Sequence, residues 1–279
     1  MDKVWFVTGA SKGLGLSLVK KLLSRGYKVA ATTRFLPVLR RSIGGDHINL
    51  LPMEVDLSNE SNIRAAIKKT LEVFGKIDVV VNNAGSAQFG TLEELSDKET
   101  RENFEANVFG MLNVIRNILP TMRSNHSGHI FNLSSIGGFV SNTSGWGVYS
   151  ATKFAVAGLS EALYSDVKHF GIRVTVVYPG LLRTDFLGAD SLRTPLHPIG
   201  DYMEARMVQE IHQQALHHHE PGNPDMVALG IIEVANAPSP PLHLFLGSDS
   251  YDMVRAKISM LEMDLEEWKG VTLITDFQF

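Results

Sequence analysis

The sequence predicts an α/β fold in which helices cover both faces of a parallel β-sheet. Seven short apolar runs recur along the 279 residues, and segments with the periodicity of amphipathic helices separate them. The runs are continuously apolar rather than alternating, which is typical of strands buried on both faces. A glycine-rich turn lies between the first run and the first helical segment. These three observations favour a Rossmann-like, doubly wound sheet in a single domain.

The same patterns place the individual elements. The expected strands are residues 4–7, 27–32, 48–54, 79–82, 129–133, 173–177 and 243–246. The expected helices are 16–24, 62–74, 101–122, 150–170 and 225–236, with a further helix near 251–263. We expect one domain, residues 1–279, with three parts: a cofactor-binding and catalytic core at 4–186, a substrate loop or lid with one short helix at 187–222, and the C-terminal helix, last strand and tail at 223–279.

Composition excludes several classes of protein. The formal net charge is −4 and the basic residues are spread along the chain, so nucleic acid is not an expected partner. The chain has no cysteine, which excludes disulfides and thiolate chemistry. No stretch is long and apolar enough for an export signal or a membrane span. We therefore expect a cytoplasmic protein with no membrane partner.

The turn at residues 8–15 resembles a dinucleotide-binding loop. Gly9 permits a tight turn after the first strand, while Gly13 and Gly15 let the backbone approach a pyrophosphate and let the helix pack on the sheet. The start of that helix offers N–H donors and a positive dipole to phosphates. The spacing is G-x-x-x-G-x-G, and its place between a strand and a helix favours nucleotide binding over a merely flexible turn.

The choice between the two nicotinamide cofactors depends on the end of the second strand. An acidic residue there holds the ribose 2′-hydroxyl of NAD, whereas a cation holds the 2′-phosphate of NADP. The sequence reads Thr32, Thr33 and Arg34, without a carboxylate, and Lys12 offers a second cation. NADP(H) is the predicted cofactor. The alternative is an NAD(H)-dependent alcohol dehydrogenase in which Arg34 points into solvent.

Tyr149 and Lys153 are candidates for proton transfer. They stand four residues apart at the start of a predicted helix, so their side chains share one face. An ammonium beside a phenol is expected to lower the tyrosine pKa from about 10, which suits a general acid or base near neutral pH. Tyr164 and Lys168 repeat the spacing roughly 22 Å further along the same helix, and we interpret them as structural.

Taken in order along the chain, these residues resemble the short-chain dehydrogenase/reductase family. The resemblance covers about residues 4–186 and rests on the turn at 8–15, Asp56, Asn82 to Gly85, Asn107, Ser134 with Ser135, Tyr149 with Lys153, and Pro179 and Gly180 with Thr184. It implies a catalytic set of Asn107, Ser135, Tyr149 and Lys153. The cofactor site that it implies consists of Gly9, Ser11, Lys12, Gly13, Leu14, Gly15, Arg34, Asp56, Leu57, Asn83, Ala84, Gly85, Tyr149, Lys153, Pro179, Gly180 and Thr184.

The resemblance also implies a role for each catalytic residue. Tyr149 would donate a proton to a carbonyl oxygen as the nicotinamide delivers hydride, and Ser135 would hold that oxygen. Lys153 would lower the phenol pKa and bind the nicotinamide ribose, and Asn107 would hold a water that connects the lysine to solvent. Ser134 remains an alternative to Ser135, because a slip of one residue exchanges the faces of a strand. Asn107 also fits a polar residue that interrupts a long helix.

The expected function is oxidoreduction between NADP(H) and a ketone, an aldehyde or a secondary alcohol, of the carbonyl reductase or ketoreductase type. A rival from another class is a redox sensor that binds NADP(H) without turnover. The resemblance implies a homo-dimer or homo-tetramer associated through the helices near 101–122 and 150–170, and the tail from residue 249 either covers that surface or completes a neighbour's pocket.

Two further groups of residues carry weaker signals. Apolar residues that flank the catalytic region either line a substrate pocket or pack in the core: Phe139, Trp146, Phe186 and Leu187. The histidines at 217–219 have His212 and Glu220 nearby, but consecutive histidines in a hydrophilic loop point in different directions. We interpret them as solvated and expect no metal.

Overall fold

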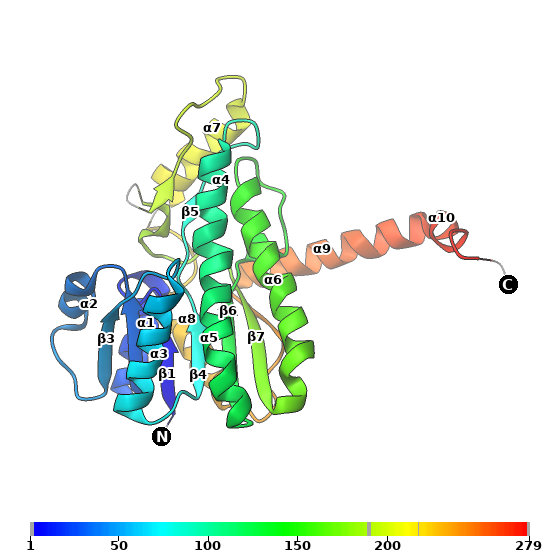
Figure 1. Ribbon diagram of the computed structural model, residues 1–279. Coiled ribbons are helices and arrows are strands. Elements are labelled where there is room, and N and C mark those ends of the chain that lie inside the picture. Colours follow the sequence, from blue (N-terminus) through cyan, green and yellow to red (C-terminus); the bar gives the residue numbers. More distant parts are fainter. Residues whose placement is uncertain (1–2, 189–190, 217, 278–279) are drawn as a thin grey trace.

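The computed structural model describes residues 3–188, 191–216 and 218–277, and its centre is one sheet of seven strands (Figure 1). All pairings in this sheet are parallel, in the order β3-β2-β1-β4-β6-β7-β9. The strands are β1 (Val4–Val7), β2 (Lys28–Thr33), β3 (Leu50–Glu54), β4 (Val79–Asn82), β6 (Gly128–Leu133), β7 (Ile172–Pro179) and β9 (His243–Leu246). The order reverses between β1 and β4, where such sheets open a crevice at the carboxyl ends of the strands. The predicted fold class is confirmed.

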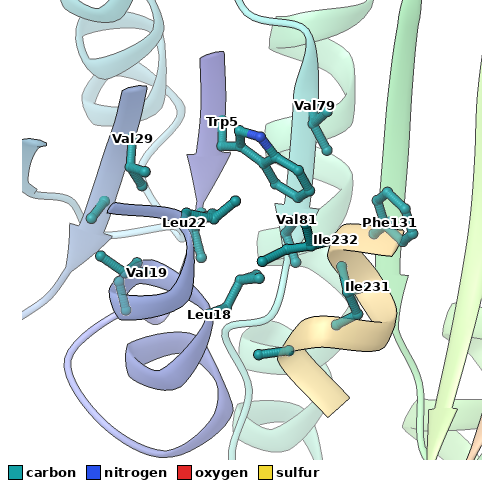
Figure 2. Close-up of a cluster of buried hydrophobic side chains, with 14 of the residues drawn as sticks. Trp5, Leu18, Val19, Leu22, Val29, Val79, Val81, Phe131, Ile231 and Ile232 are labelled. Carbon is teal, nitrogen blue, oxygen red and sulfur yellow. The ribbon is translucent and has the colours of Figure 1, made fainter. Parts of the chain in front are cut away.

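Helices cover both faces of the sheet (Figure 1). One face carries α1 (Gly13–Ser24), α2 (Leu36–Ile43) and α8 (Pro224–Asn236), and the other carries α3 (Glu60–Phe74), α5 (Gly110–Ser124) and α6 (Gly147–Val167). Each layer buries its own apolar cluster. On the first face, side chains of α1 and α8 meet those of the central strands (Figure 2). Burial of each large side chain stabilises the fold by roughly 1.5–3 kcal/mol.

The central strands explain why apolar continuity could be recognised in the sequence. All four residues of β1 are buried, including Trp5, and so are all four residues of β4. A strand buried on both faces has no polar alternation to interrupt it.

Short 3₁₀ turns follow three elements: η2 (Ile136–Gly138) after β6, η3 (Lys168–Phe170) after α6, and η4 (Asp185–Leu187) beyond β7.

The helix expected at 101–122 is longer and interrupted. It begins as α4 (Asp97–Phe104), passes through the π-helical turn η1 (Glu105–Phe109) and continues as α5. Ser96 caps its start, because the hydroxyl accepts from the backbone of Glu99 while the Glu99 carboxylate accepts from the backbone of Ser96. Single π-turns inside α-helices are frequent at functional sites. This one contains Asn107.

The segment from residue 187 to 222 has more structure than the single short helix expected. The strand β8 (Leu192–Arg193) pairs with β5 (Ala87–Gln88), and α7 (Met203–Glu210) continues into the π-helical turn η5 (Ile211–Leu216). The buried carboxylate of Glu94 holds this segment to the body: it accepts from the Arg206 guanidinium at 2.8 Å and from the backbone N–H of Ile199 at 2.8 Å. The segment is therefore anchored over the carboxyl edge of the sheet.

The tail forms two helices, α9 (Ser248–Glu267) and α10 (Lys269–Leu273), which extend away from the rest of the chain (Figure 1). Only Ser250 and Val254 of α9 are buried. Beyond them, large apolar side chains are exposed: Met260, Leu261, Met263, Leu265, Trp268, Val271, Leu273, Ile274 and Phe277. Within the described part of the chain, no helix combines the length and apolar character that a membrane crossing requires.

Candidate active site

A cavity of about 1040 Å³ lies at the carboxyl edge of the sheet. Its walls come from the glycine turn after β1, the ends of β2, β4, β6 and β7, the start of α6 and the segment at 187–222. Each predicted catalytic residue except Asn107 lines it, and so does nearly every predicted cofactor residue. A cavity of this size has room for a dinucleotide end and a small substrate.

The glycine turn has no room for side chains. Gly9 adopts a positive φ of 66°, and a Cβ atom there would stand 2.7 Å from Cα of Ala84. A Cβ atom on Gly15 would stand 2.3 Å from the carbonyl oxygen of Gly9. The backbone of α1 therefore approaches the first turn as closely as a pyrophosphate loop requires, and these residues fit a dinucleotide.

Thr8 and Asn83 join the ends of β1 and β4. The Thr8 hydroxyl accepts from the backbone N–H groups of Asn83 at 3.0 Å and of Ala84 at 3.1 Å. In return, Nδ2 of Asn83 donates to the carbonyl oxygens of Thr8 and Gly9, both at 3.0 Å. These bonds fix the floor of the cavity between the two strands where the strand order reverses.

Arg34 lies at the end of β2 on the rim of the cavity, beside Asp56. The backbone and hydroxyl of Ser58 lower the pKa of Asp56, and the positive charge of Arg34 adds to this effect. Lys12 turns instead to the lid segment, where Nζ donates to the Ser191 hydroxyl at 2.5 Å. The sequence contains no carboxylate at the end of β2, but the register places Glu54 of β3 opposite Thr33.

The two serines after β6 point in different directions. The Ser134 hydroxyl donates to the carbonyl oxygen of Lys153 at 2.8 Å and is buried against α6. The Ser135 hydroxyl accepts from the backbone of Gly137 at 3.1 Å. A Cβ atom on Gly137 would stand 3.5 Å from this hydroxyl and 3.8 Å from Cε1 of Tyr149, so the two side chains lie close together. Successive residues at a strand end face opposite sides. The geometry thus places Ser135, rather than Ser134, beside the phenol.

Lys153 lies behind Tyr149. Its Nζ donates to the carbonyl oxygen of Leu133 at 2.8 Å and stands 5.8 Å from the centre of the Tyr149 ring. Burial lowers the pKa of Lys153 to about 8. Burial also raises the pKa of Tyr149 to about 12, and the nearby Ser135 hydroxyl acts in the opposite direction. The expected lowering of the phenol pKa is therefore wrong, because burial of the phenol has the largest effect on its pKa.

Asn107 is buried in the π-helical turn, one layer behind the cavity wall. Its Oδ1 accepts from the backbone N–H of Ser86 at 2.7 Å, and its Nδ2 donates to the Ser86 carbonyl at 3.0 Å and to the Thr152 hydroxyl at 2.9 Å. A Cβ atom on Gly85 would stand 2.9 Å from Oδ1 of Asn107 and 3.6 Å from Nζ of Lys153. Asn107 and Lys153 therefore both lie against Gly85.

Asp249, which sequence reasoning missed, holds the backbone of one cavity wall from outside the cavity. It lies in the first turn of α9, and its carboxylate accepts from the backbone N–H of Leu181 at 2.7 Å. A Cβ atom on Gly180 would stand 2.0 Å from Oδ1 of Asp249, so glycine is the residue that permits this contact. The acidic residue after the last strand was the available signal, but its partner lies 68 positions earlier in the chain.

Three of the four apolar candidates line the cavity: Trp146, Phe186 and Leu187. The fourth, Phe139, packs edge-on against Tyr178 and Phe245, with ring centroids 6.0 and 5.4 Å apart. Tyr164 is 38% exposed on α6, and Nζ of Lys168 stands 5.7 Å over its ring. The second Y-x-x-x-K pair therefore forms a surface contact.

The structure describes His218 and His219 of the three consecutive histidines. His217 lies outside the described residues, and Nε2 of His218 stands 3.7 Å from the Asp185 carboxylate. Among the described residues, no three His, Cys, Asp or Glu side chains converge as a metal site would require. His212 lies elsewhere, in the cavity wall.

Comparison with known proteins establishes the family. The model of the short chain dehydrogenase family matches residues 3–193. The chain belongs to this family. A curated relative, "Oxidoreductase BOA17" of Botryotinia fuckeliana, is 32% identical over 98% of this chain and 99% of its own length. The family resemblance expected from the motifs is confirmed, and the protein is an oxidoreductase of this family.

Solved structures agree with this assignment. A short-chain dehydrogenase from Streptomyces avermitilis superposes with a TM-score of 0.89 at 33% identity, over 99% of this chain and 100% of that one. A family member from Burkholderia phymatum in complex with NAD gives 0.81 at 25% identity, over 94% and 95%. The protein ElxO with NADP bound gives 0.73 at 26% identity, over 88% and 97%.

Proposed function

We propose that the protein interconverts a ketone or aldehyde and the corresponding alcohol, with NADP(H) as cofactor and Tyr149 as the general acid and base. One observation carries the proposal: the side chains of Tyr149 and Ser135 converge next to Gly137 in a cavity that begins at the glycine turn. Two hydroxyls that converge in this way can both bond one carbonyl oxygen of a substrate.

The residues around the cavity fit a dinucleotide. The crowded positions at Gly9 and Gly15 support a pyrophosphate at the start of α1, and Asp56, Leu57 and Asn83 to Gly85 would border the adenosine. Gly13, Ser11 and Leu14 would complete the phosphate loop, and Pro179, Gly180 and Thr184 would lie near the nicotinamide. When bound, the nicotinamide supplies or accepts the hydride.

The protein's own residues would move the proton. Because burial keeps the pKa of Tyr149 at about 12, the phenol carries its proton at neutral pH and can donate it to a developing alkoxide. Lys153, with a pKa of about 8, can return a proton to the phenolate, and Asn107 would link the lysine to water. Ser135 would hold the carbonyl oxygen throughout.

Arg34 supports NADP(H), because its guanidinium can bind a 2′-phosphate at the end of β2. Glu54 ends the neighbouring strand but does not line the cavity, and its Oε2 accepts from the backbone N–H of Leu36 at 3.3 Å, so it gives the NAD(H) alternative little support. Lys12 donates a hydrogen bond to the Ser191 hydroxyl, so this lysine could bind the 2′-phosphate only after that bond breaks. Two structural neighbours carry one cofactor each, NAD in one and NADP in the other.

The test is a titration of the purified protein with NADPH and NADH, followed by nicotinamide fluorescence, and then a panel of ketones and aldehydes followed by absorbance. We expect tighter binding of NADPH and oxidation of NADPH by at least one carbonyl compound. Binding without turnover across the panel would contradict the reductase proposal and favour a redox sensor. Tighter binding of NADH would contradict the cofactor preference alone.

We further propose that residues 1–279 act as one domain in a cytoplasmic homo-dimer or homo-tetramer. The support for association is the row of exposed apolar side chains on α9 and α10, because monomers rarely expose so many in one segment. A helix that extends without packing is also marginal by itself. Light scattering on the purified protein measures the number of copies.

A further inference from the structure

His212 and Trp146 form the wall of the cavity next to Tyr149. The Trp146 ring meets the Tyr149 ring edge-on, with centroids 5.4 Å apart, and meets the His212 ring in the same way, also at 5.4 Å. All three side chains line the cavity. A substrate of one or two fused rings that bonds Tyr149 can therefore reach His212.

The hydrogen bond between these two side chains fixes the protonation of His212. The indole Nε1–H of Trp146 donates to Nδ1 of His212 at 3.1 Å. An indole N–H can only donate, so Nδ1 is an acceptor and the ring proton is on Nε2. Burial lowers the pKa of His212, which favours the same neutral form. The remaining polar atom of the ring is an N–H donor.

The position of His212 is set by a chain of contacts to the body. The turn η5 that carries His212 continues α7, and Arg206 of α7 is bound by the buried Glu94 carboxylate. The Arg206 guanidinium lies 5.8 Å over the Phe89 ring, and the Phe89 ring meets that of Trp146 edge-on at 5.6 Å. Two contacts therefore fix the position of His212: the Glu94–Arg206 ion pair, which holds α7, and the hydrogen bond from Trp146.

Phe186 and Leu187 add apolar surface to the cavity, whose lining also includes the polar residues Ser141, Asn142 and Thr143. The Phe186 ring lies 5.8 Å from that of Tyr149, and Leu187 follows it in the chain. Apolar side chains around a donor at a fixed place favour a ligand with an apolar body and an acceptor opposite that donor. A neutral imidazole gives no charge with which to bind a carboxylate substrate.

We propose that the Nε2–H of His212 determines substrate specificity by donating a hydrogen bond to an acceptor oxygen opposite the reacting carbonyl. The substrate class is a neutral cyclic or aromatic ketone that carries a hydroxyl or a second carbonyl on its far side. This inference rests on the proposed function for the position of the reacting carbonyl at Tyr149. His212 contacts the substrate directly, and Trp146 positions His212.

Two substitutions separate the donor role from a merely structural one. His212→Asn keeps an acceptor where Nδ1 stands, and so keeps the bond from Trp146, but it removes the outer donor. His212→Gln places an amide N–H near the position of Nε2. If His212 only supports Trp146, the asparagine variant should behave like the unaltered protein.

The experiment compares 4-hydroxy-1-tetralone with 1-tetralone, which lacks the hydroxyl opposite the carbonyl. Dissociation constants are measured by calorimetry with the oxidised form of whichever dinucleotide binds, so that no turnover occurs, and kcat and KM are measured separately with the reduced form. We expect the unaltered protein to bind the hydroxyketone at least about fivefold more tightly, as one hydrogen bond allows. The preference should persist in His212→Gln and fall to about one in His212→Asn, through KM rather than kcat.

The outcomes are distinguishable. Equal affinity of the unaltered protein for the two ketones would overturn the inference, as would a preference that His212→Asn retains. A preference that His212→Asn removes, without turnover of either ketone, would support the role of His212 and contradict the proposed reductase activity instead. Unchanged dinucleotide affinity in both variants confirms that the substitutions act on the substrate side of the cavity.

Discussion

The ammonium of Lys153 donates a hydrogen bond to the carbonyl oxygen of Leu133, across 2.8 Å. The last residue of β6 therefore fixes the lysine from α6 at the carboxyl edge of the sheet. Backbone carbonyls satisfy an ammonium only in part, and the group is buried, so its charged form is disfavoured. The pKa near 8 is the result.

This lowered pKa predicts a distinctive pH dependence of stability. The folded protein releases the Lys153 proton at about pH 8, whereas the unfolded chain retains it until about pH 10.5. Between these values the unfolded state binds more protons, so the free energy of unfolding should rise with pH, by at most about 1.4 kcal/mol per pH unit. Tyr149 acts in the opposite direction from about pH 10, because the unfolded chain then releases a phenol proton that the folded protein retains to about pH 12.

Lys153→Met should abolish that rise. Urea denaturation at several pH values from about 7 to 10 measures it, and Lys168→Met is the matched control because Lys168 is an exposed lysine of the same helical region. Parallel pH profiles for the unaltered protein and Lys153→Met would contradict a buried, deprotonating lysine.

Tyr149→Phe should lower kcat by roughly 10²- to 10⁴-fold, the usual contribution of a general acid. The ring remains to pack against Trp146 and Phe186, so the fold and the dinucleotide affinity should change little. Steady-state kinetics and a fluorescence titration measure the two quantities. Tyr164→Phe is the matched control, since it removes the same hydroxyl from the second Y-x-x-x-K pair; undiminished turnover in Tyr149→Phe would refute the mechanism.

The sequence sufficed for the sheet because β1 and β4 are buried on both faces and therefore read as uninterrupted apolar runs. It did not suffice for α2. Leu39 is the one buried residue of that helix, so the sequence shows no apolar side chains repeating at helical spacing. Pro37 in the first turn and Gly44 at the left-handed C-cap were local signals for that helix. The predicted ends of the other helices and strands differ from the observed ends by a few residues, because capping interactions set where a helix begins and ends.

The site was predictable where one segment supplies the geometry and unpredictable where two segments meet. The spacing of Tyr149 and Lys153 follows from a single helix, but their pKa values depend on burial by the whole fold. The contact between Gly180 and Asp249 joins the end of β7 to α9, and no local pattern encodes it. The π-turn at Asn107 likewise has no periodic signature, because it adds one residue to an otherwise regular helix.

Gly180→Ala should destabilise the protein through its clash with Asp249. A Cβ atom 2.0 Å from a carboxylate oxygen forces the Asp249 side chain to move and to lose its hydrogen bond from the backbone N–H of Leu181, which costs about 1–3 kcal/mol. Thermal and urea unfolding measure the change. Gly158→Ala is the control: that glycine lies in α6 with open space around its Cα, so alanine should stabilise the helix by up to about 1 kcal/mol.

A double-mutant cycle tests the cause. In an Asp249→Ala background the clash is absent, and the cost of Gly180→Ala should fall by most of its value. Equal costs in both backgrounds would show that the strain arises elsewhere.

Arg34→Glu should weaken NADPH binding far more than NADH binding, because a carboxylate repels the 2′-phosphate and can accept from a ribose hydroxyl. We expect at least about a tenfold loss for NADPH, equivalent to about 1.4 kcal/mol. Fluorescence titrations with each dinucleotide measure it. Arg41→Glu, an equal charge change on exposed α2, is the control; equal losses for both dinucleotides in Arg34→Glu would argue against a phosphate role.

Replacing Leu265 and Trp268 together by Glu should reduce self-association. These side chains are 63% and 59% exposed near the end of α9, where the chain extends away from the body (Figure 1). Two carboxylates there would have to be desolvated in any interface that buries the arm, which opposes association strongly. Light scattering over a range of concentrations measures the change in mass, with Ile48→Glu as the control because Ile48 is 94% exposed on the body. If neither the double substitution nor Ile48→Glu changes the mass, α9 and α10 do not hold the copies together. The exposed faces of α5 and α6 are then the next surfaces to substitute.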